Sequence, residues 1–324
     1  MVKRLLIIRL GAIGDVIMTT ALLPKLREKY PEHKIYYLTD KLTTCLIEDN
    51  PYINEVLIFQ ETRRFIEYLK WLNFDVIINL QNRLSMTLIV EYLNPREVMG
   101  FYGGVDNNVY VTNKASKELL DMFSYGRGKH KKTFFEVYCD IVGVDKKNIK
   151  PFIKVEPKKK HKNIRIGIMP GSNWPAKRWG HENFSELTDR LYKKDSKYEV
   201  AIIGDTSDSI ITNQIIKRCK IKKPKNLTGK YGLRELIHII NNLDVLVTHD
   251  TGPAFIATAL DVPLVQIFGP TNPQWSGTKD SIKPKINCKG CFKYYCHHQS
   301  CMKEIKPEIV CEAIIKKLKG DKNR

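Results

Sequence analysis

The sequence predicts an α/β protein built from two doubly wound, Rossmann-like domains. The first half of the chain alternates short apolar runs with amphipathic helical patterns, which is typical of a parallel sheet covered by helices. A polar, Lys-dense stretch at 155–163 interrupts this alternation, which restarts at residue 164. With 324 residues, 43% of them hydrophobic, the chain is long enough for two cores of ordinary domain size.

In the first half, four apolar runs are expected to form strands: RLLIIRL, KIYYLTD, EVLIF and DVIINL. The helical patterns VIMTTALLPKLREKY and TRRFIEYLKWL lie between them. We assign residues 1–154 to this N-terminal domain. The stretch VEPKKKHKN at 155–163 is assigned to a linker, because charged segments of this kind extend instead of packing.

The second domain, residues 164–324, repeats the pattern. Its expected strands are IRIGIMP, EVAIIGD, DVLVTHD and PLVQIFGP, and its expected helices are NFSELTDRLYKK, IITNQIIKRC, LRELIHIINN and GPAFIATAL. The last segment, PEIVCEAIIKKLK, predicts a terminal amphipathic helix that begins just behind Pro307. In doubly wound sheets ligands bind outside the carboxyl ends of the strands. We therefore expect the two domains to face each other across a cleft lined by those loops.

The net charge of +19 indicates an anionic partner: nucleic acid, phospholipid or phosphosugar. The basic clusters at 129–132, 158–160 and 222–225 lack interleaved aromatic residues, which disfavours nucleic acid as the partner. An anionic lipid surface explains the positive charge equally well. The apolar N-terminal run is interrupted by Arg9, Gly11, Gly14 and Asp15, unlike a signal peptide. No apolar run approaches the roughly 20 residues of a membrane span. We expect a cytoplasmic protein, at most peripheral to the membrane.

The loop after the first strand contains Gly11, Gly14 and Asp15 and leads directly into a helix. Glycines let the backbone approach a ligand closely, and a helix N-terminus offers free N–H groups. The G-x-G-x-x-G spacing of dinucleotide-binding proteins is missing, which disfavours an oxidoreductase. Asp15 is either an ordinary N-cap or, at the edge of a cleft, a base.

The corresponding loop of the second domain, PGSNWPAKRW at 170–179, is longer than the usual 2 to 6 residues of a βα connection. Ser172 and Asn173 supply hydrogen-bond donors, and Lys177 and Arg178 supply positive charge, a combination that suits a diphosphate. The alternative is a solvated basic loop packed by its two Trp residues.

The run HDTGP at 249–253 ends one strand and opens a short apolar helix. Thr251 or Gly252 at the cap and Pro253 at the first helical position are ordinary for a helix start. The apolar helix is expected to be buried, with its positive end available to a pyrophosphate. Capping explains Asp250 less well, and a sugar or ribose hydroxyl is the expected partner of its carboxylate.

The three loops together resemble glycosyltransferase family nine, the heptosyltransferases of the GT-B fold. The similarity runs through IIRLGAIGDVIMTTALLPKLREKYP, PGSNWPAKRW and HDTGPAFIATALDVPLVQIFGPTNP. It implies an N-terminal acceptor-binding domain and a C-terminal domain that binds the nucleotide sugar. The implied reaction is inverting, metal-independent transfer of heptose from ADP-heptose to the inner core of lipopolysaccharide, without a cofactor, at the cytoplasmic face of the inner membrane.

The resemblance also implies roles for single residues. Asp15 would be the general base, and Lys177 would neutralise the leaving diphosphate. Donor-binding residues would be Ser172, Asn173, Lys177, Asp250, Thr251 and Gly252. Many relatives carry His five positions after the Asp of the last motif, where this chain has Phe255. No motif identifies the base of the nucleotide. A family member that uses another nucleotide sugar or surface glycan therefore remains the alternative.

Several residues of the first domain suit an anionic acceptor. Two arginines open a helix after the third strand, and a Gln and an Arg follow the fourth strand at its carboxyl end. A solvated helix face explains the first pair equally well. The acceptor-binding candidates are Gly14, Arg63, Arg64, Gln81 and Arg83.

The eight cysteines fall into two groups. Cys45, Cys139 and Cys219 are scattered as buried thiols usually are. The other five lie near the C-terminus, with His297 and His298 among them. Zinc binding through the first C-x2-C pair and reduced or redox-sensitive thiols both remain open, and the resemblance assigns this cluster no catalytic role. These five are Cys288, Cys291, Cys296, Cys301 and Cys311.

Overall fold

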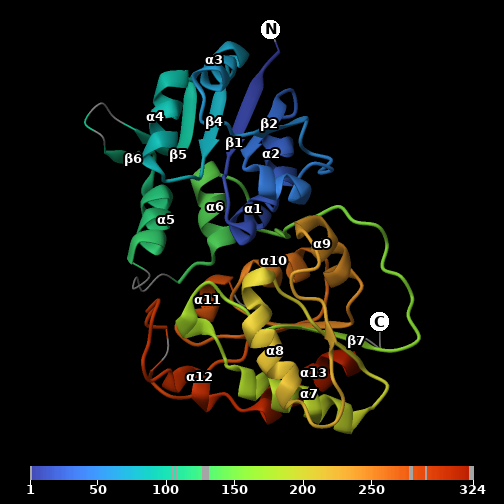
Figure 1. Cartoon of the computed structure of the whole chain (residues 1–324). Helices are drawn as coiled ribbons and strands as arrows, with labels where there is room; N and C mark the ends of the chain where they lie inside the picture. Colours follow the sequence, from blue (N-terminus) through green and yellow to red (C-terminus); the bar gives the residue numbers. More distant parts are fainter. Residues whose placement is uncertain are drawn as a thin grey trace. The chain divides into compact units, whose positions relative to one another are not determined.

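The computed structural model describes residues 2–103, 106, 108–125, 131–276, 280–288 and 290–320. The chain divides into two compact units, residues 1–154 and 155–324. Each unit is a sheet of mainly parallel strands with helices packed against it (Figure 1). Residues 155–163 form neither helix nor strand.

The first unit holds a six-stranded sheet in the order β3-β2-β1-β4-β5-β6. Neighbouring strands are parallel except β6, which is antiparallel to β5. The four strands expected in this half are confirmed. The sequence pattern missed β5, which contains two glycines, and β6, which has three residues. The strands are β1 (Arg4–Ile8), β2 (Lys34–Thr39), β3 (Glu55–Ile58), β4 (Val76–Asn79), β5 (Glu97–Gly103) and β6 (Val109–Val111).

The first expected helix is two helices, α1 (Ile13–Thr20) and α2 (Leu23–Lys29). Pro24 cannot donate a backbone hydrogen bond to the preceding turn, so it suits the first turn of a new helix. Thr19 and Thr20 direct their hydroxyls to the carbonyls of Val16 and Ile17, which bends helices and competes with their regular hydrogen bonds. The chain therefore turns between α1 and α2.

The other helices of this unit have local start and stop signals. Thr62 caps α3 through a 3.3 Å hydrogen bond from the amide of Phe65, and Asn73 ends it in the left-handed conformation. Thr133 and Glu136 form a capping box at α6. The remaining elements are the 3-10 helix η1 (Lys41–Leu46), α3 (Arg63–Leu72), α4 (Leu84–Leu93), α5 (Lys114–Tyr125) and α6 (Phe134–Val142).

The second unit holds a five-stranded, all-parallel sheet in the order β11-β10-β7-β8-β9. The four strands expected here are confirmed, and the pattern missed only the two-residue edge strand β9 among the strands of the described residues. The strands are β7 (Arg165–Met169), β8 (Glu199–Ile202), β9 (Lys225–Asn226), β10 (Val245–His249) and β11 (Leu264–Ile267).

The expected helices of the second unit are also found, and α13 begins at Pro307 itself. Shorter helical turns sit in the loops between the strands and the main helices. The helical elements are η2 (Pro175–Lys177), α7 (His181–Lys194), η3 (Thr206–Asp208), α8 (Ser209–Arg218), α9 (Leu233–Asn241), α10 (Gly252–Ala259), α11 (Pro273–Ser276), α12 (Ser300–Glu304) and α13 (Pro307–Gly320).

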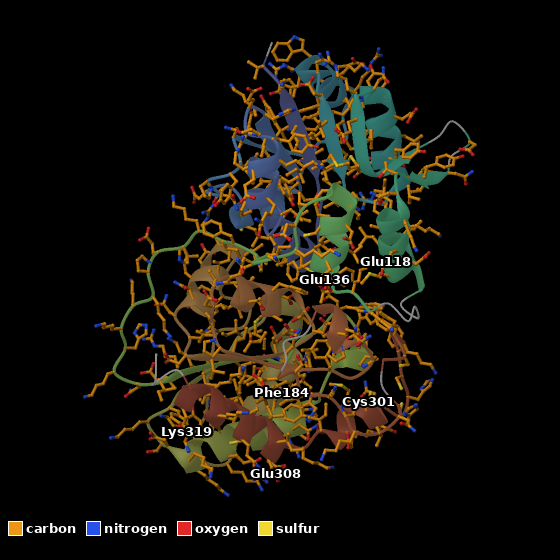
Figure 2. The ribbon with its side chains drawn as sticks, turned by 180° about the vertical axis from the view of Figure 1, so that it is seen from behind. Glu118, Glu136, Phe184, Cys301, Glu308 and Lys319 are labelled. Carbon is orange, nitrogen blue, oxygen red and sulfur yellow. The ribbon has the colours of Figure 1, made fainter. Side chains whose placement is uncertain are left out.

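Each unit has its own apolar core. In the second unit, Phe184 lies inside this core (Figure 2) and contacts the ring of Trp179 edge-on, with centroids 4.9 Å apart. The surface helices α7 and α13 are joined by an ion pair between Arg190 and Glu308. Within the described ranges, no helix is long and apolar enough to cross a membrane.

The scattered cysteines are not all buried. Cys139 and Cys219 are buried as expected, but Cys45 is half-buried, so that part of the prediction is wrong. Cys45 lies in the short helix η1, where the buried side chains are Thr43 and Leu46. A 3-10 turn repeats every three residues, which places Thr43 and Leu46 on one inner face and Cys45 beside it.

Candidate functional site

Asp15 lies in the first turn of α1, directly after the loop that follows β1. The N-cap of this helix is Ala12, so the simpler interpretation of Asp15 as the N-cap is wrong. The carboxylate Oδ2 instead accepts the Ala12 amide at 3.4 Å and pairs with Arg9 at 2.5 Å. The side chain of Asp15 keeps 27% of its surface exposed. It is therefore both fixed in direction and accessible.

Arg9 is the buried partner that fixes Asp15. Its side chain is only 4% exposed, and its Nη1 donates to the Leu80 carbonyl in the loop after β4. The phenols of Tyr37 and Tyr138 are buried nearby, and burial raises the pKa of both well above the ordinary value. Since both phenols stay neutral, the carboxylate of Asp15 is the group that compensates the Arg9 charge.

The acceptor-binding candidates fall in three places. Gly14 is a buried residue of α1. Gln81 and Arg83 follow β4, which pairs with β1, so they share one edge of the sheet with the Asp15 loop. Arg63 and Arg64 begin α3 after β3, two strands away from β1, and both are exposed. The structure thus groups three of the five candidates with Asp15.

In the second unit, Lys177 and Asp250 contact each other directly. Lys177 Nζ lies 3.0 Å from the Asp250 carboxylate and 2.9 Å from its carbonyl oxygen. Both side chains are 13% exposed, and the ammonium also lies 4.8 Å from the centroid of the Trp174 ring. The other carboxylate oxygen accepts the Ser276 hydroxyl at 2.8 Å. Sequence reasoning missed Ser276, because its position in α11 carries no motif.

The loop at 170–180 is folded by its own hydrogen bonds. The Ser172 hydroxyl accepts the Trp174 amide at 3.2 Å, and Arg178 Nε donates to the Ser172 carbonyl at 3.0 Å. Asn173 is exposed. A Cβ on Gly171 would stand 2.1 Å from the Asp208 carboxylate, so any larger residue here would have to displace Asp208. The loop combines self-packing with an exposed polar tip.

His249, the last residue of β10, links this loop to the sheet. Its side chain is fully buried. Nε2 accepts the Trp179 amide at 3.1 Å, and Nδ1 lies 3.3 Å from the Gly171 carbonyl. Burial lowers the pKa of His249 to about 4, so the neutral ring donates from Nδ1. This anchor holds both ends of the loop and thereby sets Lys177 against Asp250. No local pattern in the sequence signals this role of His249, because its partners lie about 70 to 78 residues earlier in the chain.

The helix α10 begins beside this pair. Thr251 is its N-cap, one of the two expected cap residues, but its first residue is Gly252, so Pro253 stands at the second helical position and not at the first as expected. The Thr251 hydroxyl lies 3.2 Å from that of Thr248 and does not cap the helix, so the first-turn N–H groups lack a side-chain acceptor among the described residues. Such groups attract anions. The next strand, β11, is followed by Thr271, whose buried hydroxyl has no partner within the described part of the chain.

Phe255 lies in α10. The sequence predicted that a phenylalanine at this position removes a polar contact. Its side chain is 8% exposed and belongs to the buried face of the helix. A phenylalanine here can pack but cannot form a hydrogen bond to a sugar hydroxyl.

Zinc binding is one of the two interpretations that the sequence leaves open for the C-terminal cysteines. Among the described residues, no group of three or more His, Cys, Asp or Glu side chains is arranged to hold a metal ion. All of these thiols are free. Burial raises the pKa of Cys301 to about 11, and the neighbouring Cys288 and Cys291 add to this rise. Cys301 packs beneath Gly269, where an added Cβ would stand 3.2 Å from its sulfur, so it supports the loop after β11.

Comparison with known proteins assigns the chain to a family. Residues 62–308 match the family model of glycosyltransferase family 9 (heptosyltransferase). The chain belongs to glycosyltransferase family 9. Lipopolysaccharide heptosyltransferase 2 of Salmonella typhimurium is 25% identical over 300 residues, which cover 84% of each protein. Lipooligosaccharide heptosyltransferase 2 of Haemophilus influenzae is also 25% identical, over 84% of this chain and 85% of the relative. This family 9 member is therefore a glycosyltransferase.

Solved structures confirm the GT-B type of fold. The glycosyl transferase family 9 protein from Veillonella parvula superimposes with a TM-score of 0.78 at 22% identity, over 98% of this chain and 97% of the other. E. coli ADP-heptose lipopolysaccharide heptosyltransferase II superimposes with a TM-score of 0.76 at 22% identity, over 99% of each chain.

Proposed function

We propose that this family 9 glycosyltransferase transfers heptose from ADP-heptose to the inner core of lipopolysaccharide. The names of the similar proteins support this choice of donor and acceptor: two curated relatives are heptosyltransferases of lipopolysaccharide or lipooligosaccharide, and one solved neighbour is described as an ADP-heptose enzyme. The observation that carries the chemistry is the Asp15 carboxylate, held at 2.5 Å by the buried Arg9 and still partly exposed.

In the proposed reaction, Asp15 accepts the proton of the acceptor hydroxyl as the hydroxyl oxygen attacks the anomeric carbon of the donor. The new C–O bond forms on the face opposite the diphosphate. The bond to the diphosphate breaks, and the bonding electrons leave with the phosphate oxygen. The configuration at the anomeric carbon is therefore inverted.

The donor is proposed to bind in the second unit. Its diphosphate would draw Lys177 away from Asp250 and lie at the N-terminus of α10, with Ser172, Asn173 and Thr251 as further hydrogen-bond donors. Asp250 would then accept sugar hydroxyls, next to the backbone of Gly252. Positive charge from Lys177 and the helix terminus would stabilise the leaving group without a metal ion, so a chelator should leave the rate unchanged.

The acceptor is proposed to bind the first unit through Gly14, Gln81 and Arg83, with Arg63 and Arg64 reaching more distant phosphates. A chain with a net charge of +19 suits an anionic glycolipid. We propose a cytoplasmic enzyme that meets this acceptor at the surface of the inner membrane, and that does not use nucleic acid as a partner.

One observation favours a second candidate. Phe255 provides an apolar surface where a polar side chain would select a sugar hydroxyl. A donor with fewer hydroxyls at that place, carried on the same or another nucleotide, would fit this position. The second candidate is thus a family 9 transferase that uses a different nucleotide sugar or surface glycan.

Binding of ADP, UDP, GDP and NAD, measured by calorimetry, separates these proposals. We expect a preference for ADP that is lost in Lys177→Ala and kept in Lys197→Ala, a control that removes an exposed lysine. Turnover of ADP-heptose with a heptose-free core acceptor should follow. A preference for UDP or GDP would discard ADP-heptose and retain the transferase, whereas binding that survives Lys177→Ala would place the diphosphate elsewhere.

A further inference from the structure

The second unit contains a cavity that is separate from the proposed donor site. The cavity has a volume of about 730 Å³. Arg165 and Glu199, which line it, are the first residues of β7 and β8, whereas the donor candidates follow the carboxyl ends of strands. The edge strand β9 and the last turn of α9 complete its walls. We call it the basic cavity; its principal residues are Lys159, Arg165, Tyr192, Glu199, Lys222 and Lys225.

The charged residues of the basic cavity are mostly positive. Four of its principal residues are cations, and Glu199 is the single carboxylate among them. Glu199 is already engaged, because its oxygens accept Arg165 Nε and Asn163 Nδ2, each at 3.1 Å. The hydrogen bond from Asn163 and the charge of Arg165 lower the pKa of Glu199. The carboxylate therefore neutralises Arg165 and leaves the lysines uncompensated.

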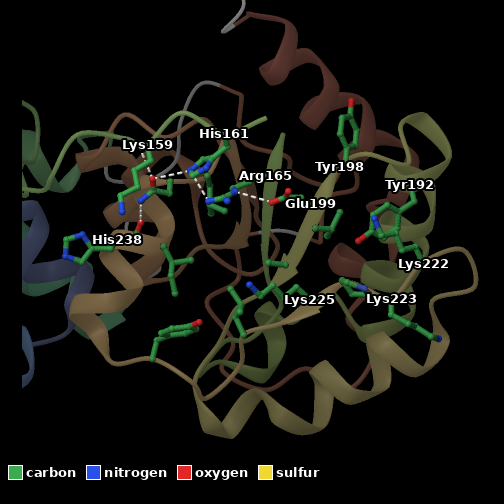
Figure 3. A pocket seen from close by; sticks show the side chains of 18 residues that line it. Lys159, His161, Arg165, Tyr192, Tyr198, Glu199, Lys222, Lys223, Lys225 and His238 are labelled. Carbon is green, nitrogen blue, oxygen red and sulfur yellow. Dashed lines mark hydrogen bonds and ion pairs between the residues drawn. The ribbon is translucent and has the colours of Figure 1, made fainter. Parts of the chain in front are cut away.

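The lysines differ in what they contact. Lys222 Nζ lies 5.1 Å from the centroid of the Tyr192 ring and 3.3 Å from the Ser196 carbonyl. Lys159 and Lys225 are exposed, and within the described residues neither ammonium group has a hydrogen-bond or ion-pair partner. Figure 3 shows Lys159 with His161 and Arg165 on one side of the cavity, and Tyr192 with Lys222 on the other. Two unpaired cations thus border an opening with aromatic walls.

These features define the class of ligand. Cavities of 300 to 1,000 Å³ are typical of small-molecule sites, and clustered ammonium groups select phosphate or other compact anions. The half-buried Tyr198 adds apolar surface next to the charges, whereas Tyr192 is buried and mainly supports Lys222. A neutral ligand would leave the lysines unpaired, and a cation would be repelled.

We propose that the basic cavity binds a phosphate-bearing ligand at a site distinct from the donor site. Lys159 and Lys225 contact the phosphate oxygens, Lys222 adds charge from the far wall, and Tyr198 packs against the remainder of the ligand. The same chemistry is presented by a soluble phosphorylated compound and by the headgroup of an anionic phospholipid. The inference does not depend on which donor sugar the enzyme uses.

The test measures two probes on the full-length protein. Inorganic pyrophosphate is titrated by calorimetry, and vesicles of phosphatidylcholine with and without phosphatidylglycerol are used in co-sedimentation. The double variant Lys159→Ala/Lys225→Ala is compared with Lys283→Ala/Lys303→Ala, which removes two exposed lysines outside the cavity. Lys177→Ala identifies pyrophosphate binding that belongs to the donor site.

We expect the cavity variant to bind at least one probe tenfold or more weakly, while the control variant and Lys177→Ala retain that binding. Loss confined to pyrophosphate identifies a soluble phosphorylated ligand, and loss confined to phosphatidylglycerol vesicles identifies a lipid headgroup. If the control variant binds the probe equally weakly, the overall charge of the protein explains the effect and the proposal is overturned. Wild-type protein that binds neither probe, or that loses all binding in Lys177→Ala, would also overturn it.

Discussion

At the scale of single residues, the ion pair between Arg9 and Asp15 has two separable effects. The guanidinium is 4% exposed and the carboxylate 27%, so the pair is largely withdrawn from water. Removing one partner of a buried pair leaves an uncompensated charge. Loss of Asp15 therefore affects folding as well as any reaction in which it accepts a proton, and a single alanine variant would confuse the two.

Asp15→Asn should lower kcat by about 10² to 10⁴, the usual contribution of a general base, and should lose less stability than Asp15→Ala, because its amide oxygen still accepts from Arg9 although the negative charge is gone. Asp15→Ala should lose activity and also about 1 to 3 kcal/mol of stability, less than a fully buried pair would lose because Asp15 is partly exposed. Urea unfolding and steady-state rates measure both effects.

The control is the double variant Arg9→Met/Asp15→Ala, which removes the buried charge together with its partner and should regain most of the lost stability without regaining activity. Full activity in Asp15→Asn would show that Asp15 is only a structural element of α1.

His249 predicts a pH dependence of stability. Burial lowers its pKa from 6.5 to about 4, so between these values the unfolded chain binds a proton that the folded protein does not. The free energy of unfolding should therefore fall as the pH decreases from 6.5 to 4, by up to about 3 kcal/mol. Urea unfolding of the wild type and His249→Gln over this pH range isolates the effect. An identical pH dependence in both proteins would contradict it.

At the scale of elements, the sequence predicted best where periodicity was strong. All eight expected strands are present, because fully buried parallel strands require continuous apolar runs such as those of β1 and β10. The strands that were missed are at or near sheet edges, where Gly100 and Gly103 or a length of two to three residues weaken the pattern. The break between α1 and α2 lies beside Pro24, inside a segment whose apolar periodicity continues and therefore predicted one helix.

The candidate site was predictable only in part for a related reason. Loops after strand ends could be located, so Asp15, Lys177 and Asp250 do follow the carboxyl ends of β1, β7 and β10, although Asp15 lies inside the first turn of α1 and not in the loop or at the cap. The contacts within those loops could not be, because they join residues far apart in sequence. Arg9 reaches the carbonyl of Leu80, and Trp179 donates to His249, and neither pairing leaves a local signal.

The capping box of α6 offers a test at this scale. The Thr133 amide donates to Glu136 at 2.7 Å, and the Glu136 amide donates to Thr133 at 3.2 Å. Thr133→Ala should lower the free energy of unfolding by about 1 kcal/mol. Because α6 carries Tyr138 beside Arg9, we also expect a small loss of activity. Thr133→Ser keeps the oxygen and should match the wild type in unfolding by urea; equal destabilisation by both substitutions would exclude capping.

At the scale of the whole molecule, the two units divide the proposed work. Each has its own sheet and its own apolar core. The proposed base belongs to the first unit, and all the proposed donor contacts belong to the second. The contacts that organise the donor loops, from His249 to Gly171 and from Lys177 to Asp250, are also internal to the second unit. If the donor binds as proposed, its contacts should require no side chain of the first.

A chain limited to residues 155–324 should consequently fold cooperatively and bind the donor nucleotide within about tenfold of the full-length affinity, while catalysing no transfer because Asp15 is absent. Its all-parallel sheet keeps both faces covered by its own helices, which a parallel sheet requires. Circular dichroism during urea unfolding and calorimetry with ADP measure folding and binding, with Lys177→Ala in the same fragment as the control. A folded fragment that fails to bind any nucleotide would show that the first unit supplies part of the donor site, and an unfolded fragment would show that the two cores are not independent.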